Sequence, residues 1–293
     1  MAGPFPFCAL WALTLATASG CSLFGSVQSG QLAEAERPRN EALAPETSVA
    51  EEHPGNGEES GSPIGAIAAR LAEASDEDEK LPFREAMPSP AMSKNAKASQ
   101  YANLSASACK RAIKERNLPA KDATAKGVAT PMRLTGPLHG VRFITAPAPS
   151  PFGVADCRLI LALDDFAEVL ARFDVVSVQL DSMFRSRARI AGKKKMASQH
   201  AHGMAADIVA FTFADKRRVP VEGNWGASIG AIPCGPAAVL EERTGDILLL
   251  RDIACAVGRS GAFHHLLTPS FDAAHRNHFH FDIKPHTKMW AIR

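Results

Sequence analysis

A change in composition near residue 95 limits what this chain can fold into more than any motif does. Residues 26–95 hold 14 Asp and Glu against 6 Lys and Arg, are rich in Glu, Ala, Ser, Gly and Pro, and contain almost no aromatic side chains. Such a stretch buries too little apolar surface to offset its chain entropy. We therefore expect a disordered acidic linker over 26–95 and a folded domain over 96–293, a length sufficient for one core.

The first 25 residues predict export. The apolar stretch from Pro4 to Ala18 is too short to span a bilayer and has the length of a signal-peptide core. Small residues precede Cys21, so the segment resembles a bacterial lipoprotein signal whose cysteine becomes lipidated, although Ala18 stands where such signals carry Leu. We expect a periplasmic or outer-envelope protein attached to a membrane by a lipid anchor. The alternatives are a simply cleaved secretory signal and a misassigned start codon.

Four cysteines remain once Cys8 and Cys21 are assigned to the signal. An even number in an oxidising compartment predicts two disulfides, for which three connectivities are open. The wide spacings contain no CxxC, which argues against a cysteine zinc site. We favour the pairing that joins neighbours in sequence, Cys109 with Cys157 and Cys234 with Cys255.

Hydrophobic periodicity predicts both helices and strands within 96–293. Helical spacing is seen over 99–116, 159–173 and most of 236–257, where Gly245 is expected to break or kink the helix. Apolar, β-branched runs predict strands over 174–184 and 207–213. The elements follow no regular strand–helix–strand rhythm, so the expected fold class is α+β.

Residues 275–283 read HRNHFHFDI and place three histidines within six positions. On a strand over 278–283, His278, His280 and Asp282 share one face, while Phe279 and its apolar neighbours share the other. Imidazoles beside a carboxylate are the arrangement that zinc sites use. The alternative is a pair of surface histidines on an edge strand.

A second polar cluster, SQHAHGMAADI, spans residues 198–208. A carboxylate at the mouth of a buried strand, such as Asp207, is costly unless it is paired or bound to a cation. The small residues between His200 and Asp207 allow a tight turn that brings the two together. With His280 they form a two-histidine, one-carboxylate set, which predicts one Zn²⁺ with a coordination position left open for catalysis.

The order S-x-H-x-x-G-x-A-x-D, followed some 70 residues later by H-x-H, resembles the zinc peptidases related to D-alanyl-D-alanine carboxypeptidases, lysostaphin-type endopeptidases and the hedgehog domain. Within that group, residues 105–293 look like the bacterial extensin-like C-terminal family. The resemblance implies a small, mainly antiparallel sheet flanked by helices. It also implies His200, Asp207 and His280 as zinc ligands, Ser198 as a supporting residue, and Arg185 as the group that stabilises the substrate's oxyanion.

The chain departs from these relatives at the general base. Dipeptidase relatives carry a glutamate three residues before the last ligand, where this chain has Asn277, which cannot accept a proton. The base role would pass to His278, as in relatives with H-x-H, or to His275. Asp282 is expected to support a ligand imidazole, and His264 and His265 are expected to be packing or surface residues. The relatives also carry a cysteine where this chain has Phe184.

These observations predict an exported zinc metallopeptidase, a carboxypeptidase or endopeptidase, that cuts D-amino-acid-containing peptides of peptidoglycan in the stem or the cross-link. The alternative is a non-catalytic, zinc-containing module that binds the cell wall, which Asn277 favours. Residues 185–195 hold six basic residues, for which a solvated loop is the default interpretation. No nucleic-acid-binding motif accompanies them, so we expect no nucleic-acid partner and a monomer.

Overall fold

A computed structural model describes residues 81–87, 95–147, 150–190, 192–287 and 289–293. The predicted signal segment, the lipidation site Cys21 and most of the predicted linker lie outside the described residues. Within the described part of the chain, no helix combines the length and the apolar character needed to cross a membrane.

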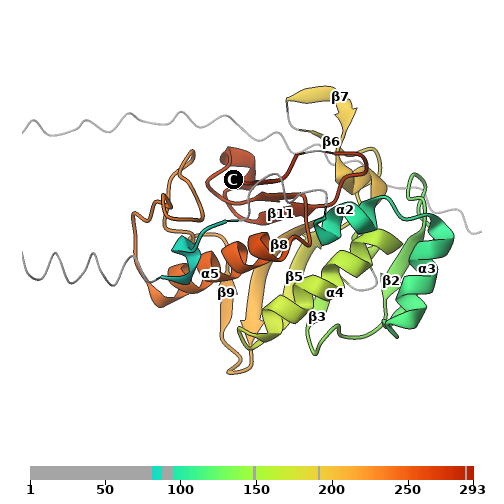
Figure 1. Ribbon diagram of the computed structural model, residues 1–293, viewed down its shortest axis with the longest axis horizontal. Helices are drawn as coiled ribbons and strands as arrows, with labels where there is room; N and C mark the ends of the chain where they lie inside the picture. The colour runs from blue at the N-terminus through green and yellow to red at the C-terminus, as the bar shows by residue number, and fades with distance from the viewer. Residues whose placement is uncertain (1–80, 88–94, 148–149, 191, 288) are drawn as a thin grey trace, which may run out of the picture. The chain divides into compact units, whose positions relative to one another are not determined.

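A seven-stranded mixed sheet forms the centre of the fold (Figure 1). Its central pairs are antiparallel, whereas β3 pairs with β5 and β10 pairs with β12 in parallel. In order across the sheet the strands are β12 (Ala291–Ile292), β10 (His265–Leu267), β11 (Phe279–Asp282), β8 (Ala205–Phe213), β5 (Val175–Ser182) and β3 (Arg142–Thr145), with β9 (Arg218–Pro220) paired to β8.

Four helices lie in the described residues: α2 (Lys97–Ala102), α3 (Ala106–Glu115), α4 (Cys157–Ala171) and α5 (Gly245–Ser260). A small sheet joins β1 (Ala120–Asp122), β2 (Pro131–Leu134) and β4 (Ala155–Asp156), and a hairpin joins β6 (Arg189–Ile190) to β7 (Lys193–Ala197). Short 3₁₀ turns are η1 (Pro82–Arg84), η3 (Pro151–Gly153), η4 (Gln199–His202) and η5 (Ala273–His275). The predicted α+β class is confirmed.

The core lies between α4 and one face of the large sheet. The ring of Phe166 on α4 meets the rings of Phe263 and Phe281 edge-on, with centroids 5.8 and 5.6 Å apart. The fully buried rings of Phe279 and Phe281 of β11 stack with centroids 5.7 Å apart, so they share one face of the strand as predicted. The opposite face of β11 is also shielded from solvent, because His280 is only 9% exposed and Asp282 only 7%.

Two predicted helices have different limits in the structure. The helix expected over 99–116 is interrupted after α2, and α3 begins where the Ser105 hydroxyl accepts a hydrogen bond from Ala108 N at 3.2 Å. The helix expected over 236–257 forms only from Gly245 onward, where Thr244 Oγ1 accepts from Ile247 N at 3.2 Å. In both cases a hydroxyl cap satisfies the free N–H groups of a helix start, which apolar periodicity does not report.

Both favoured disulfides are present. Cys109–Cys157 ties α3 to the first residue of α4, and Cys234–Cys255 ties a loop to α5. All four sulfur-bearing side chains are buried. The pairing of sequence neighbours is therefore confirmed.

Residues 81–87, which the sequence assigns to the linker, pack on the folded domain. Phe83 is fully buried beside the Cys234–Cys255 disulfide, and its ring lies 5.5 Å from the guanidinium carbon of the buried Arg251. Its backbone N–H donates to Asp252 Oδ1 at 2.9 Å, and its carbonyl accepts from Gly235 N at 2.8 Å. A single aromatic residue thus extends the domain beyond the expected boundary.

Replacing Phe83 with Ala should lower the free energy of unfolding by about 3–4 kcal/mol, because a fully buried aromatic ring is lost and a cavity remains. Urea denaturation of the full-length protein measures this change. A loss below about 1 kcal/mol would show that residues 81–87 do not hold the domain together in solution.

His264 is a buried histidine with a fixed tautomer. Lys284 N–H donates to its Nδ1 at 3.0 Å, so the ring proton sits on Nε2, which lies 3.0 Å from Ser99 Oγ. Burial lowers the pKa of His264 to about 4. Packing was one of the two roles expected for this residue.

In the folded protein His264 stays neutral down to a pH of about 4, whereas its pKa in the unfolded chain is about 6.5. Between these two pH values the unfolded chain therefore binds a proton more readily than the folded protein does. Stability should therefore fall by about 3 kcal/mol through this residue as the pH drops from about 6.5 to 4. The His264→Gln variant should lose that share of the pH dependence in denaturation curves. An unchanged slope in the variant would assign the acid sensitivity to other groups.

Candidate metal centre

The large sheet brings together side chains that are far apart in the sequence. Asp207 on β8 is the direct cross-strand partner of His280 on β11 and of Ser182 on β5. Residues directly opposite each other in a sheet point to the same face. This face lies opposite the one that Phe279 and Phe281 present to α4.

The turn η4 carries His200 to the same point. The Ser198 hydroxyl caps this turn and accepts a hydrogen bond from His200 N at 3.4 Å. Ser198, the predicted supporting residue, therefore lies at the start of the turn that carries His200. Gly203 ends the turn with φ +63°, and a Cβ there would lie 2.9 Å from Asp156 N. Only glycine fits this position, so the glycine of the motif sets the path from His200 to Asp207.

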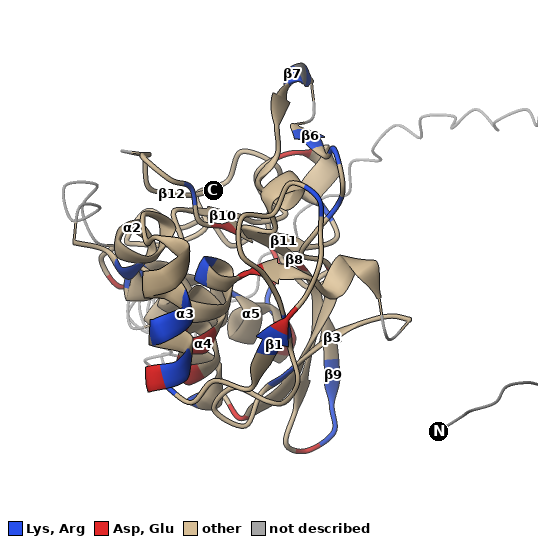
Figure 2. Ribbon diagram, turned by 90° about the vertical axis from the view of Figure 1, so that its right-hand side faces the viewer, with Lys and Arg blue, Asp and Glu red and all other residues tan. Residues whose placement is uncertain are grey.

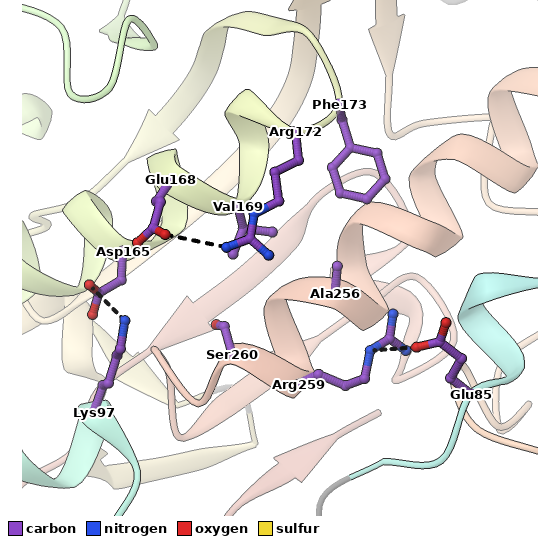
Figure 3. A pocket seen from close by; sticks show the side chains of 10 residues that line it. All are labelled: Glu85, Lys97, Asp165, Glu168, Val169, Arg172, Phe173, Ala256, Arg259 and Ser260. Carbon is purple, nitrogen blue, oxygen red and sulfur yellow. Dashed lines mark hydrogen bonds and ion pairs between the residues drawn. The ribbon is translucent and has the colours of Figure 1, made fainter.

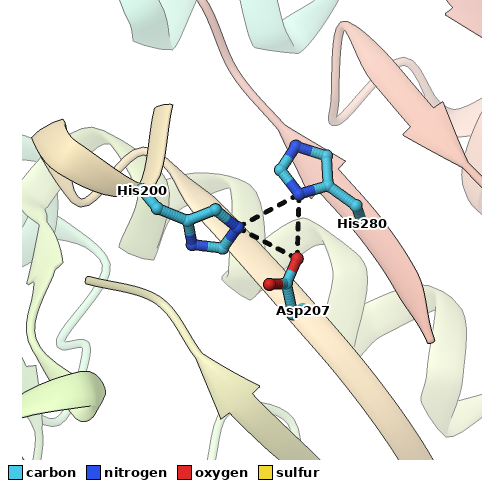
Figure 4. A group of neighbouring side chains, drawn as sticks. All are labelled: His200, Asp207 and His280. Atoms are coloured by element: carbon cyan, nitrogen blue, oxygen red, sulfur yellow. Dashed lines mark hydrogen bonds and ion pairs between the residues drawn. The ribbon is translucent and has the colours of Figure 1, made fainter. Parts of the chain in front are cut away.

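The three predicted ligands converge (Figure 4). His200 Nε2 lies 2.9 Å from Asp207 Oδ1, His280 Nδ1 lies 2.8 Å from the same oxygen, and the two nitrogens are 3.1 Å apart. All three residues are buried.

Each of the two imidazoles has an acceptor on its outer side as well as Asp207 on its inner side. His200 Nδ1 is 3.2 Å from the Met183 carbonyl, and His280 Nε2 is 3.4 Å from Asp282 Oδ2. Both outer partners can only accept, so with a cation in the centre each imidazole would donate outward and turn its inner nitrogen toward the ion as a ligand. A carboxylate and two imidazole nitrogens crowded in a buried site require a positive charge, either a metal ion or protons on the imidazoles.

A metal ion fits this donor set. Tetrahedral ligands at zinc–ligand distances of about 2.0–2.1 Å stand about 3.3 Å apart, close to the 2.8–3.1 Å separations here. The buried Ser182 hydroxyl, on the same face, has no hydrogen-bond partner among the described residues. The group of His200, Asp207 and His280 could therefore hold a metal ion.

Without a cation, protonation compensates in part. Burial opposes ionisation of Asp207, but its close contacts with His200 and His280 outweigh burial and hold its pKa far below the usual range. Burial likewise opposes charge on His280, yet contacts with Asp207 and Asp282 raise its pKa to about 9. Burial dominates at His200 and lowers its pKa. The site is thus built around one positive charge.

Arg185 lies at the rim of this centre. Its Nη2 is 3.1 Å from Asp207 Oδ2, the oxygen that does not face the histidines, and its side chain is 45% exposed. The guanidinium has five donors, of which a single carboxylate oxygen uses only a few. Arg185 can therefore hold the carboxylate and still offer donors to a ligand arriving from solvent.

His278 faces the centre from the start of β11. Its Nδ1 lies 2.9 Å from Asn277 Oδ1, an amide oxygen that can only accept, so Nδ1 carries the proton. The free Nε2 points inward and lies 3.6 Å from Asp207 Oδ1. Burial lowers the pKa of His278, which leaves the imidazole neutral and able to accept a proton. Asn277 thus orients the neighbouring imidazole.

His275 lies beside His278 and His280, with ring centroids 5.2 and 5.8 Å away. Its Nδ1 donates to Asp272 Oδ1 at 2.7 Å. Asp272 was missed by sequence reasoning, and its position three residues before His275 in a short 3₁₀ turn is the only local signal for it.

Asp282 connects His280 to a second histidine. Its Oδ2 lies 3.4 Å from His280 Nε2, and its Oδ1 accepts from His265 Nδ1 at 2.8 Å. His265 is the cross-strand partner of Asp282 on β10. The sequence assigned His265 to packing or the surface, because nothing in FHHLL indicates which strand it faces.

A cavity of about 500 Å³ between α4 and α5 lies on the helical side of the fold (Figure 3). Its charged side chains pair with one another: Arg172 with Glu168, Arg259 with Glu85, and Lys97 with Asp165. These pairs leave no uncompensated charge for a ligand, so we do not assign a function to this cavity.

The centre should bind one Zn²⁺ per chain, as measured by elemental analysis after dialysis and by a rise in melting temperature. His280→Ala should abolish binding, because the remaining pair cannot complete the site. Asp282→Asn should weaken binding by about 10- to 100-fold, because it only orients His280. His202→Ala is the matched control, since this exposed imidazole faces the Gly127 carbonyl, 3.3 Å from its Nδ1. Stoichiometric zinc in the His280→Ala protein would refute the assignment.

Comparison with known proteins supports the family expected from the motifs. Searches of curated proteins and of solved structures found no match. A family model described as extensin-like protein C-terminus matches residues 105–293, which include every residue of the centre described above. The chain therefore belongs to the extensin-like protein C-terminus family.

Proposed function

We propose that this protein is an exported zinc-dependent peptidase that acts on peptidoglycan peptides. The observation that carries the proposal is the convergence of His200 Nε2, Asp207 Oδ1 and His280 Nδ1 at one buried point. Two histidines and a carboxylate are the protein ligands of many catalytic zinc sites. The motif resemblance to D-alanyl-D-alanine carboxypeptidases and hedgehog-type domains supports the same chemistry and the same type of fold.

The surrounding residues supply the other functions that hydrolysis needs. Bound zinc would lower the pKa of a water molecule and polarise a peptide carbonyl. His278 Nε2 would accept the proton of the attacking water and return it to the leaving amine as the C–N bond breaks. Arg185 would donate to the carbonyl oxygen as negative charge develops there, or to a substrate carboxylate.

The contacts of Asn277 bear on the main argument for a non-catalytic role. Asn277 cannot accept a proton as the glutamate of dipeptidase relatives does. This missing base was the argument for a wall-binding module. In the structure its amide oxygen holds the His278 Nδ1 proton, which leaves Nε2 as a base on the inner side. The neutral His278 therefore supports catalysis without a glutamate.

The substrate class and the location rest on other arguments. The predicted signal and the lipidation site Cys21 support an enzyme of the periplasm or outer envelope, anchored to a membrane by lipid. Peptides with D-amino acids, in the stem or the cross-link, follow from the motif resemblance. We propose that the protein acts as a monomer.

The test is to incubate the zinc-loaded full-length protein with purified peptidoglycan and to identify released fragments by mass spectrometry. The wild type should release peptide fragments, and His280→Ala should release none. His278→Gln should lower kcat by about 100- to 10,000-fold while keeping its zinc, because it removes only the base. His202→Ala should match the wild type.

Each contrary result has a defined meaning. Peptidoglycan that is bound but not cut by the zinc-loaded wild type would assign the protein to the wall-binding alternative. Full activity in His278→Gln with loss of activity in His275→Gln would move the base to His275. Cleavage that survives in His280→Ala would refute zinc-dependent hydrolysis.

A further inference from the structure

Next to the metal centre the chain has a strongly basic segment, residues 185–190 and 192–197, which we call the basic arm. No Asp or Glu stands between Asp181 and Asp207, whereas the arm holds six basic residues: Arg185, Arg187, Arg189, Lys193, Lys194 and Lys195. The β6–β7 hairpin forms its outer part and stands out from the rest of the domain, with its basic residues in blue in Figure 2.

Four cations of the arm are not neutralised by the described residues. Arg187, Arg189, Lys193 and Lys195 are exposed, and within the described residues none of these four forms an ion pair. Elsewhere, exposed arginines such as Arg172 and Arg217 pair with nearby carboxylates. Like charges held close together raise the electrostatic energy of the folded protein, and an anionic ligand would relieve that repulsion.

Both ends of the arm are fixed at the metal centre. Arg185 N donates to the His200 carbonyl at 3.1 Å, and Ser198 N donates to the Ala188 carbonyl at 3.0 Å. The guanidinium of Arg185 also reaches Asp207. A ligand that is bound at the centre and extends past Arg185 would therefore lie along the arm.

Strand alternation along β7 places two lysines on one face. Lys193, Lys195 and Ala197 alternate along β7 and point the same way. On β6, Arg189 lies opposite Ala197 and Ile190 lies opposite Lys193, with a register shift between the two pairs. Alternate residues of a strand stand about 7 Å apart, which is also the spacing of side chains on one face of an extended peptide.

We propose that the basic arm binds carboxylates of the peptide strands attached to the wall polymer, so that the enzyme engages the polymer beyond the bond it cuts. This rests on the proposed function for its substrate class. The arm lacks aromatic residues, on which proteins that bind single-stranded nucleic acid stack bases. It also lacks the Trp, Phe and Leu of membrane-surface segments. Ile190 and Met196, 37% and 45% exposed, add modest apolar contact.

The experiment measures sedimentation of the full-length protein with insoluble peptidoglycan, in a His278→Gln background so that little substrate is consumed during the measurement. The arm variant carries Arg189→Gln, Lys193→Gln and Lys195→Gln. The control carries Arg111→Gln, Lys114→Gln and Lys121→Gln, three exposed cations on α3 and β1 that change the net charge equally. A second substrate is the same peptidoglycan with its carboxylates converted to amides.

The arm variant should bind native peptidoglycan about tenfold more weakly at low ionic strength, and the control less than twofold. Amidation should weaken binding of the control but hardly affect the arm variant. Equal losses in the two variants would overturn the proposal in favour of net charge alone. Tighter arm-dependent binding to RNA or to anionic vesicles than to peptidoglycan would also overturn it. Because binding is scored without cleavage, an inactive wild type would refute the peptidase and leave this test intact.

Discussion

The pairing of β8 with β11 at Asp207 and His280 is the constraint on which the centre depends. It places a carboxylate in the middle of a sheet, where an unpaired charge would be strongly destabilising. His200 contacts Asp207 from η4, His280 contacts it from the facing strand β11, and Arg185 contacts it from the rim of the centre. Three separate segments of the chain are thereby fixed at one point.

The large sheet separates two environments, and this separation makes the centre possible. On one face, Phe279 and Phe281 pack against Phe166 of α4 and provide the apolar burial that stabilises the fold. On the other face, His280 and Asp282 are buried among polar partners, each with its hydrogen bonds satisfied. The rigid aromatic layer therefore holds the imidazoles in place, and the ligand geometry does not depend on loops alone.

Much of the centre was predictable because its chemistry is local in sequence. Period-two alternation assigned His280 and Phe281 to opposite faces, and the small residues around Gly203 indicated the tight turn that returns the chain to Asp207. Other contacts were not predictable. Asp272 and His265 are ordinary residues in sequence, and their roles follow from a short turn and a β10–β11 pairing that no local pattern reports. The burial of Phe83 was missed because its neighbours have the composition of a linker.

The sequence by itself indicated the candidate ligand types, the alternation of β11 and the family, since each depends on residue identity and spacing. Three disulfide connectivities stayed open until the fold brought the sulfur atoms together. Only the tertiary structure decided how the side chains are protonated and oriented. Asn277 illustrates the difference. In the sequence it marks a missing carboxylate, whereas in the fold its amide oxygen holds the His278 proton on Nδ1 and leaves Nε2 free. A hydrogen bond has a direction in space, and residue order does not fix that direction.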